Sequence, residues 1–468
     1  MKVLKFGGTS VGSAQRMKDV AKLITGSRNI IVLSAMSGTT NSLVEISEYL
    51  YKKNPDGANE IINQLAQKYD RHVEELYSTE EYKQKAKEYI KSHFDYIRSF
   101  TKDLFTLFEE KIVLSQGELI STGMMNLYLN ECGVKSVLIP ALDYMRTDKN
   151  AEPDPVYIKE KLGKLLAEHE DAELFITQGY ICRNAYGEVD NLQRGGSDYS
   201  ASLVGAAIGA EEIQIWTDID GMHNNDPRFV EGTSPVRHLH FEEAAELAYF
   251  GAKILHPTCI LPAKLNNIPV RLLNTMQPDA PGTLISNQTE KGKIKAVAAK
   301  DNITAIKIKS GRMLLATGFL RKVFEIFENY QTPIDMVTTS EVGVSVTIDN
   351  RKHLEEIVDD LKKYGTVTVD NDMVIICVVG DLEWDNIGFE ARIVEALNNV
   401  PVRMISYGGS NYNVSLLVKA SDKKKALQEL SDHLFNNNKD HQLFHIKRRC
   451  QNREIASLSS KRRRVKKR

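Results

Sequence analysis

The stretch VLKFGGTSVG, residues 3–12, decides the fold class, because it joins a short apolar strand to a two-glycine turn that leads into a helix. The same order of strand, small-residue turn and helical periodicity recurs along the first 290 or so residues. The other joints are IIVLSA into Ser37-Gly38, LFITQG into Tyr180, IQIWTD into Ile219-Asp220-Gly221 and PVRLLN into Thr275. Strands that alternate with helices predict a mostly parallel sheet covered by helices. Ligands bind at the carboxyl ends of the strands in such sheets, so these turns are the expected functional site.

Length and composition predict a globular protein of several domains. The chain has 468 residues, of which 42% are hydrophobic and 26% are charged, and these values exclude a disordered, fibrous or disulfide-scaffold class. No run approaches the roughly 18 consecutive apolar residues that a membrane span needs, and glycine interrupts the N-terminal strand too early for a signal peptide. We therefore expect a cytoplasmic protein with no membrane partner.

The cysteines agree with this expectation. Their number is odd and their spacing matches neither a zinc site nor a redox dithiol, so we expect reduced thiols that are mostly buried. The five are Cys132, Cys182, Cys259, Cys377 and Cys450.

Charge is distributed unevenly along the chain. Residues 439–468 contain 12 of the 61 Lys and Arg but 2 of the 62 Asp and Glu, which leaves the first 438 residues acidic. The final KRRRVKKR matches a nucleic-acid patch or an import signal, but it belongs to neither the repeat nor the folded pattern before it. Residues 437–468 are therefore expected to form a solvated, disordered tail, and no nucleic-acid partner is expected.

Two further features predict the domain organisation. Residues 54–111 are rich in Glu, Lys, Leu, Tyr and Phe at helical spacing, which predicts a helical excursion from the sheet. From residue 302 a repeat appears at an offset of 70 residues, in which Gly318-Phe319 returns as Gly388-Phe389. Such a repeat predicts a small α+β domain that occurs twice, over 302–370 and 371–436, after a domain over 1–290.

The turn after the first strand predicts an anion site. Lys5 ends the strand, Gly7 and Gly8 form the turn, and a helix is expected from about Ala14. Backbone N–H groups at such a turn, beside a lysine, suit phosphate, although the turn also fits a plain tight connection. The absence of GxxxxGK[ST] and GxGxxG excludes the P-loop and dinucleotide-binding classes. The hydroxyls of SAMSGTTN, residues 34–41, suit ligand oxygens or an N-cap for a helix from about Leu43.

A third cluster carries opposite charges. RGGSD, residues 194–198, places a guanidinium, two glycine amides, a hydroxyl and a carboxylate before the apolar helix expected over 199–208. These groups suit a zwitterion, since Arg pairs with a carboxylate and Asp with an ammonium; the alternative is a capped helix with Arg194 in solvent. Glu118 follows Gly117 in an apolar stretch, where it lies either at a helix start or in the cleft. Two cations of later turns, Arg228 and Lys253, fit a polyphosphate unless both are surface charges.

In this order the motifs resemble those of aspartate kinases, members of the amino-acid kinase family with tandem C-terminal ACT domains. The resemblance rests on KFGGTSV, SAxSGxTN, Gly117-Glu118, RGGSDYSA, TDxxG…DPR at 217–228, GAKILHP and PGT at 281–283. The repeat resembles the ACT pair, so the match covers about 1–435. It implies an enzyme that uses ATP to phosphorylate the side-chain carboxylate of L-aspartate, the first step of lysine, threonine and methionine biosynthesis. The protein-kinase motifs HRD and DFG are absent, which excludes that class.

The resemblance also implies residue roles. Catalytic roles are expected for Lys5, Ser34 and Asp198. The residues expected to bind aspartate are Thr40, Glu118, Arg194, Gly195, Gly196 and Ser197. Those expected to bind the nucleotide are Lys5, Phe6, Gly7, Gly8, Thr217, Asp218, His223, Arg228, Lys253 and Ile254. No protein metal site is expected, because Mg²⁺ should travel with ATP. Departures from the family pattern at Gln193, Asp190-Asn191 and His223 put the loop before RGGSD and one nucleotide contact in question.

The implied reaction needs no general base, because a free aspartate carboxylate has a pKa of about 3.9 and is ionised at neutral pH. The protein has to hold two anions in line and stabilise charge on the transferred group. Two other functions stay open: another amino-acid or carbamate kinase of the same fold, and a sensor whose kinase domain is inactive. The tandem repeat argues against the first, and the presence of Lys5, Arg194 and Asp198 argues against the second.

The repeat is the expected site of feedback inhibition. Small α+β repeats expose sheet edges, so we expect a homodimer or a dimer of dimers paired through the ACT domains. Asp335 is expected to meet the ammonium of the effector, unless it is a helix cap. Lysine is the expected inhibitor, with threonine second because Ala316 replaces a hydroxyl found in some lysine-sensitive relatives. The expected effector-binding residues are Met313, Ala316, Gly318, Phe319, Leu320, Ile334, Asp335, Thr339 and Ser340.

Overall fold

The computed structural model describes residues 1–192, 195–252, 255–310 and 317–436, and the chain divides into two compact units. The first unit contains Met1–Met222, Pro235–Tyr249 and Lys253–Thr289. The second contains His223–Ser234, Phe250–Ala252 and the chain from Glu290 onward. Among the helices of the described ranges, none is long and apolar enough to cross a membrane.

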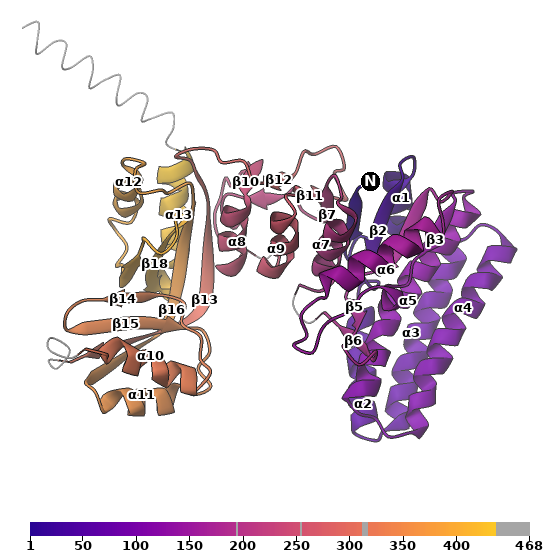
Figure 1. The fold of residues 1–468 in the computed structure, drawn as a ribbon, viewed down its shortest axis with the longest axis horizontal. Coiled ribbons are helices and arrows are strands. Elements are labelled where there is room, and N and C mark those ends of the chain that lie inside the picture. The colour runs from indigo at the N-terminus through magenta and orange to yellow at the C-terminus, as the bar shows by residue number, and fades with distance from the viewer. Residues whose placement is uncertain (193–194, 253–254, 311–316, 437–468) are drawn as a thin grey trace, which may run out of the picture. The chain divides into compact units, whose positions relative to one another are not determined.

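An eight-stranded sheet forms the centre of the first unit (Figure 1). Its strand order is β10-β12-β11-β7-β1-β2-β4-β3, and all neighbours are parallel except β11 and β12, which confirms the expected mostly parallel sheet. The strands are β1 (Val3–Phe6), β2 (Asn29–Leu33), β3 (Ser136–Leu138), β4 (Leu174–Gln178), β7 (Ile213–Thr217), β10 (His238–His240), β11 (Val270–Asn274) and β12 (Thr283–Ser286). The carboxyl ends of β1, β2 and β7 therefore lie side by side at one edge.

Nine α-helices of the first unit are described. They are α1 (Ala14–Ile24), α2 (Thr39–Tyr51), α3 (Pro55–Leu76), α4 (Glu80–Ser99), α5 (Leu107–Glu131), α6 (Pro155–Ala167), α7 (Gly196–Ile208), α8 (Phe241–Tyr249) and α9 (Pro257–Leu265). The remaining short strands are β5 (Ile181–Arg183), which pairs with β6 (Val189–Asn191), and β8 (Met222–His223) and β9 (Pro235–Val236).

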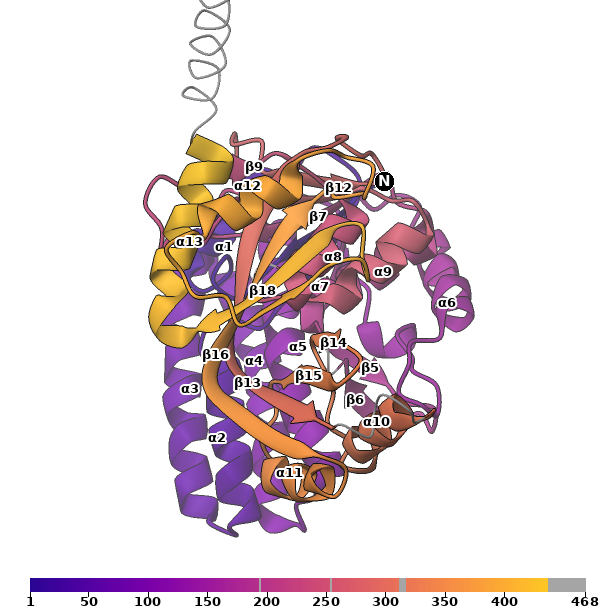
Figure 2. The same ribbon diagram turned by 90° about the vertical axis from the view of Figure 1, so that its left-hand side faces the viewer.

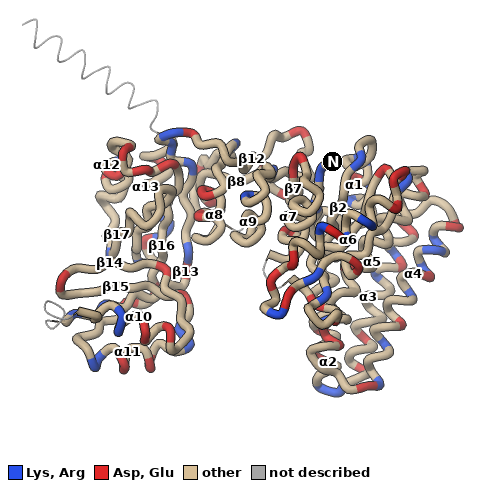
Figure 3. Tube along the Cα trace, viewed as in Figure 1, with Lys and Arg blue, Asp and Glu red and all other residues tan. Residues whose placement is uncertain are grey.

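The helical excursion is confirmed as helices α3 and α4, which pack with α2 and α5. Their buried faces carry large apolar side chains such as Tyr69 and Phe94, whose rings lie edge to face with centroids 5.8 Å apart. Lys, Arg, Asp and Glu of both signs occur along these helices (Figure 3), and they form ion pairs such as Lys83–Glu74 at 3.2 Å. This amphipathic pattern explains why the segment folds as a helical layer rather than continuing the sheet.

The second unit is built on one antiparallel six-stranded sheet, β14-β15-β13-β16-β18-β17. The two repeats share it, because the long strands β13 and β16 pair with each other along most of their length. Its strands are β13 (Ile294–Lys309), β14 (Val337–Thr339), β15 (Gly343–Ile348), β16 (Thr366–Gly380), β17 (Met404–Ser406) and β18 (Asn413–Lys419). Its helices are α10 (Phe319–Asn329), α11 (Leu354–Lys362), α12 (Phe389–Ala396) and α13 (Lys423–Ser431).

The predicted repeat is confirmed at its glycines. Gly318 and Gly388 both have positive φ, 86° and 91°, and each precedes the first residue of a helix, the buried Phe319 or Phe389. Glycine is favoured there because other residues seldom adopt that backbone conformation. Each repeat has its own apolar core, and α10 and α11 lie at one end of the sheet while α12 and α13 lie at the other (Figure 2).

The cysteines of the described ranges are free thiols, as expected. Cys182, Cys259 and Cys377 are buried, whereas Cys132 at the end of α5 is exposed. Cys450 and the predicted tail over 437–468 lie outside the described residues.

Candidate active site at the ends of strands β1, β2 and β7

Lys5 and Asp198 form an ion pair at the centre of the predicted site. Lys5 is on β1 and Asp198 is in the first turn of α7, and Lys5 Nζ lies 2.8 Å from Asp198 Oδ1. The two atoms form a close charge pair without hydrogen-bond alignment, since Asp198 Oδ1 has no hydrogen-bond partner. Both side chains are mostly buried, at 11% and 19% exposed, which strengthens their attraction. The structure thus joins two residues that are 193 positions apart in the sequence.

The turn after β1 lies beside this pair. A side chain added at Gly7 would place its Cβ 3.5 Å from Lys5 Nζ, so the lysine folds back over the turn. Gly8 is closed in by Ala35 of the neighbouring turn, because a Cβ there would lie 2.8 Å from the Ala35 oxygen. Ser10 Oγ donates to Thr275 Oγ1 at 3.3 Å, which connects this turn to the end of β11. Phe6, the last residue of β1, is fully buried and stacks on Trp216.

A hydrogen bond between two hydroxyls connects the end of β2 to the start of α7. Ser34 Oγ donates to Ser197 Oγ at 2.9 Å. Helix α7 begins at Gly196, three residues before the predicted start, with Gly195 as its N-cap at φ 77°. Gly196, Ser197 and Asp198 therefore form the first turn of a helix, whose N-terminus favours an anion, although the Asp198 N–H already donates to the Gly195 carbonyl at 3.1 Å. The neighbour Arg194 lies outside the described residues.

The SAMSGTTN turn leads into α2 earlier than predicted. The helix begins at Thr39 rather than near Leu43, and its N-cap is Gly38, which makes no side-chain cap bond. The prediction missed this start because no Ser, Thr, Asp or Asn marks the N-cap. Thr39 is buried and Thr40 is exposed, so consecutive threonines on one helical turn face in different directions.

Glu118 lies in the middle of α5, so the alternative of a helix start is wrong. It is 5% exposed, and its Oε2 has no hydrogen-bond partner. Burial raises the pKa of its carboxyl to about 8, although the amides of Glu118 and Ala35 act in the opposite direction. Gly117 permits this close approach, because a Cβ there would lie 2.8 Å from the Ala35 Cβ. A buried carboxyl with an unpartnered oxygen suits a ligand that brings its own donor.

The loop before RGGSD has a support that the sequence did not predict. Lys111 of α5 lies 2.9 Å from Asp190 and donates to the side-chain oxygen of Asn191 at 3.0 Å. These are the two positions where this chain departs from the family pattern, and both belong to the β5–β6 hairpin. The third departure in this loop, Gln193, lies outside the described residues. A local motif could not indicate Lys111, which is 79 residues earlier in the chain.

The predicted nucleotide-binding residues are distributed over both units. Thr217 ends β7, and its carbonyl accepts from the Thr275 hydroxyl at 3.0 Å, while Asp218 is exposed. His223 and Arg228 belong to the second unit, where His223 contacts the Thr233 hydroxyl at 2.9 Å. Arg228 is paired with Asp226 at 2.6 Å. The remaining two, Lys253 and Ile254, lie outside the described residues, so these nucleotide roles stay predictions.

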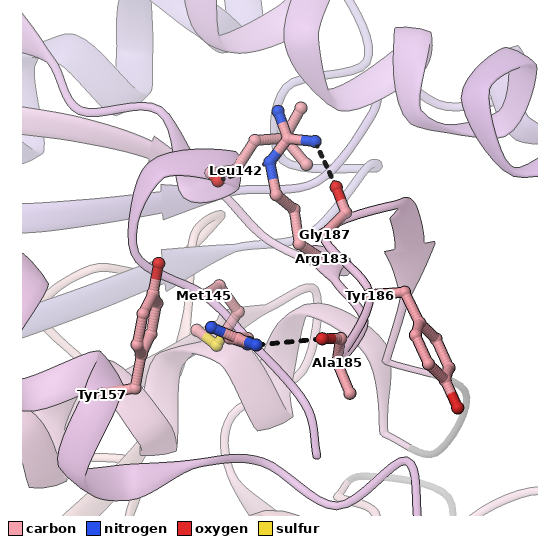
Figure 4. A pocket seen from close by; sticks show the side chains of 8 residues that line it. Leu142, Met145, Tyr157, Arg183, Ala185, Tyr186 and Gly187 are labelled. Carbon is pink, nitrogen blue, oxygen red and sulfur yellow. Dashed lines mark hydrogen bonds between the residues drawn. The ribbon is translucent and has the colours of Figure 1, made fainter. Parts of the chain in front are cut away.

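A pocket of about 230 Å³ next to the β5–β6 hairpin contains none of the predicted site residues (Figure 4). Its arginines bind backbone carbonyls: Arg183 donates to Gly187 at 2.7 Å and to Leu142 at 3.0 Å, and Arg146 donates to Ala185 at 2.9 Å. They hold the hairpin that leads toward RGGSD. The arginines of this pocket therefore stabilise the hairpin beside the predicted site, and the pocket itself is not the centre of that site.

The predicted effector residues lie in the first repeat. Asp335 precedes β14 and is not a helix cap. Its side chain is 2% exposed, and its Oδ1 accepts from Lys300 Nζ at 2.7 Å, while Oδ2 has no hydrogen-bond partner. Lys300 also lies 2.9 Å from Asp349.

The other predicted effector residues lie on α10 and near β14 and β15 of the same repeat. Gly318 and Phe319 begin α10, and Leu320 is partly exposed. Ile334 is half-buried, Thr339 Oγ1 donates to the Gly343 carbonyl at 3.3 Å and Ser340 N donates to the same oxygen at 2.9 Å. Met313 and Ala316 lie outside the described residues.

Comparisons with known proteins agree with this architecture. The model of the amino acid kinase family matches residues 1–274, and a model of the ACT domain matches residues 376–434. The chloroplastic aspartokinase 1 of Arabidopsis thaliana is 35% identical over 464 residues, which cover 92% of this chain and 80% of the relative.

Solved structures agree as well. Escherichia coli aspartokinase III is known in complex with aspartate and ADP, in the R-state, and with lysine and aspartate, in the T-state. Each is 32% identical to this chain with a TM-score of 0.76, and the alignments cover 93% of this chain and 100% and 99% of the two structures. The chain therefore belongs to the amino acid kinase family and, within it, to the aspartokinases that carry C-terminal ACT domains.

Proposed function

We propose that this chain transfers the γ-phosphoryl group of ATP to the side-chain carboxylate of L-aspartate, which forms 4-phospho-L-aspartate and ADP. The observation that carries the proposal is the meeting of Lys5, Asp198 and the Ser34–Ser197 hydroxyls at the ends of β1 and β2. The aspartate and ADP bound by the E. coli relative are the ligands that such a site would hold.

The proposed mechanism is positioning and charge stabilisation. The carboxylate of aspartate attacks the γ-phosphorus, its O–P bond forms as the bond to ADP breaks, and no proton has to be removed. Lys5 and the amides of Gly7 and Gly8 stabilise the charge on the transferred group, because Lys5 lies directly over that turn. Lys253 is assigned to the nucleotide phosphates. Mg²⁺ is proposed to travel with the nucleotide, because it keeps several waters and binds mainly through substrate phosphates.

Aspartate is proposed to bind between α5, α2 and α7. Arg194 takes its α-carboxylate, and the glycine amides and Ser197 at the start of α7 add donors. Glu118 and Asp198 take the ammonium, and the unpartnered Oε2 of Glu118 supports this role because a buried carboxyl gains a partner when the ammonium binds. Thr40 is exposed on the first turn of α2 and adds a hydroxyl.

The proposed function includes feedback inhibition through the ACT repeats. Lysine, with threonine as second candidate, is proposed to bind at the first ACT repeat through Asp335, and the T-state complex of the E. coli relative with lysine supports lysine. Inhibition then acts by favouring one of two global states. The proposal includes ACT-mediated dimers or dimers of dimers, a cytoplasmic location, and domains over 1–290, 302–370 and 371–436.

A coupled assay of ADP release tests the proposed activity with L-aspartate, L-glutamate and buffer alone. Release that depends on aspartate and not on glutamate is the expected result. Release with glutamate alone would assign another amino-acid kinase of this fold. Binding of lysine without any turnover would assign an amino-acid sensor with an inactive kinase domain.

A further inference from the structure

Helix α3 adds two side-chain hydrogen bonds to the Ser37–Thr40 turn, beside backbone bonds such as that from Thr39 N to the Met36 carbonyl at 3.0 Å. Its N-cap, Gly38, has φ 83° and no side chain with which to cap α2. Two residues of α3 supply bonds instead: Lys68 Nζ donates to the Ser37 carbonyl at 2.8 Å, and the Tyr69 hydroxyl shares a 2.8 Å hydrogen bond with Thr39 Oγ1. Both α3 residues come from the helical excursion, 31 and 30 positions after their partners.

The bond between Tyr69 and Thr39 is completely enclosed. Both side chains are 0% exposed, so each hydroxyl would lose its partner without gaining water if the other were removed. Burial raises the pKa of the Tyr69 phenol, the bond to Thr39 opposes this, and the charge of Glu118 raises it further. The phenol is therefore neutral at physiological pH and lies within the electrostatic reach of the Glu118 carboxyl.

This bond fixes the residue next to it. Thr39 and Thr40 are consecutive in the first turn of α2, so an anchored Thr39 determines where the exposed Thr40 hydroxyl lies. The same turn contacts α5, because a Cβ on Gly117 would lie 3.4 Å from Thr39 Cγ2 and 2.8 Å from the Ala35 Cβ. A shift of Thr39 would thus change the positions of both Thr40 and the segment that faces Glu118.

We propose that Lys68 and Tyr69 are positioning residues for aspartate. They hold the Ser37–Thr40 turn from outside, and they act on substrate binding through Thr40 and Glu118 without touching the substrate. This inference rests on the proposed function, because it assumes that aspartate binds to that turn. It gives the helical excursion a role in substrate affinity beyond covering the sheet.

Tyr69→Phe is the sharpest test, since it removes one oxygen and leaves the ring in the core. We expect the KM for aspartate to rise about tenfold while the KM for ATP changes less than twofold, as the loss of one buried hydrogen bond near a single subsite predicts. The matched control is Tyr77→Phe, which removes another buried hydroxyl of α3's C-terminal end, one that donates to the Met124 carbonyl at 2.7 Å. It should lower the Tm similarly and leave both KM values unchanged.

Lys68→Met tests the second bond, with Lys85→Met as its control because Lys85 forms an exposed pair with Glu81 on α4. We expect a severalfold rise in the aspartate KM for Lys68→Met and no rise for the control. A double-mutant cycle of Tyr69→Phe and Thr39→Val should give a double variant no worse than the more impaired single variant, because both changes remove one bond.

The possible outcomes distinguish a failure of this inference from a failure of the proposed function. If wild type releases ADP with aspartate but Tyr69→Phe and Lys68→Met keep its aspartate KM, the inference is overturned and the proposed function stands. Aspartate binding measured by calorimetry then has to be unchanged as well. If wild type itself shows neither aspartate-dependent turnover nor aspartate binding, both the inference and the proposed function are overturned.

Discussion

Each unit of the molecule contains a buried carboxyl group, and the two differ in their counter-charge. Glu118 in the first unit has no ion-pair partner among the described residues, and burial raises its pKa to about 8. Asp335 in the second unit is also buried with one oxygen unpartnered, and burial raises its pKa too, but Lys300 lies 2.7 Å away and opposes that shift.

The difference indicates how each site would respond to a ligand ammonium. Glu118 has to lose a proton or gain a cation, so the ligand itself can supply the missing charge. Asp335 already has an internal cation, and a ligand would have to share the carboxylate with Lys300 or add a bond to the unpartnered oxygen. The comparison therefore predicts strong coupling between pH and binding at Glu118, and weaker coupling at Asp335.

The largest effect is expected at the Lys5–Asp198 charge pair of the first unit. Lys5→Ala should reduce kcat roughly 100-fold or more with the fold retained, because single groups that stabilise transition-state charge contribute about that much. The ADP-release assay measures it, with circular dichroism as the check on folding. A kcat near that of wild type would remove Lys5 from the transition state.

Glu118→Gln sharpens the comparison directly. Glutamine has no charge to pair with the ammonium of aspartate. We therefore expect the aspartate KM to rise at least about tenfold, which corresponds to the loss of one charged hydrogen bond. In wild type the binding of aspartate near pH 7 should release a proton, because the ammonium lowers the raised pKa of Glu118. Calorimetry in buffers of different ionisation enthalpy measures this proton, and the variant should release none from this site.

Glu118 also predicts a pH dependence of stability. Its pKa is raised from 4.5 to about 8 in the folded chain, so between those values the folded state binds more protons than the unfolded state. The contribution of this residue to the free energy of unfolding therefore falls as pH rises, by at most about 1.4 kcal/mol per pH unit. Thermal unfolding of wild type and Glu118→Gln from pH 5 to 8 measures it. A constant difference between the two proteins would contradict the raised pKa.

Asp335→Ala tests the other half of the comparison. The substitution leaves Lys300 paired with Asp349, so basal activity should stay within about twofold of wild type, while inhibition by lysine should weaken about tenfold or more. Titrations of lysine and threonine against the variant measure both. Asp359→Ala is the control, since Asp359 forms an exposed pair with Lys362 on the same repeat. Equal inhibition of wild type and Asp335→Ala would exclude Asp335 from the effector site.

The smallest effect is expected outside both sites. Removal of residues 439–468 should leave kcat, both KM values and inhibition unchanged, because this basic segment belongs to neither the repeat nor the catalytic motifs. Activity and size-exclusion profiles measure the result. Loss of active, monodisperse protein would give the segment a structural role.

Much of the fold could be predicted from local patterns. The strand VLKF, which carries Lys5, and the helix from Ala14 lie as expected, and the repeated glycines Gly318 and Gly388 precede equivalent helices. Helix α5 was harder to predict, because its middle is buried nearly all round and shows no amphipathic period. The sequence therefore left open whether Glu118 lies at a helix start or in the cleft, and the structure places it in the interior of the helix.

The sequence by itself determined the mostly parallel sheet, the doubled α+β repeat and the motifs at the strand ends, since each depends on neighbouring residues and on backbone geometry. Only the tertiary structure decided which distant side chains meet. Lys68 and Tyr69 are two of many polar residues on the amphipathic helix α3, and Lys111 on α5 and Lys300 on β13 likewise carry no local sign of their partners. Local periodicity shows which face of a helix is buried. The partner of a buried polar group is chosen by packing between elements far apart in the chain, because an unpaired group there would cost free energy.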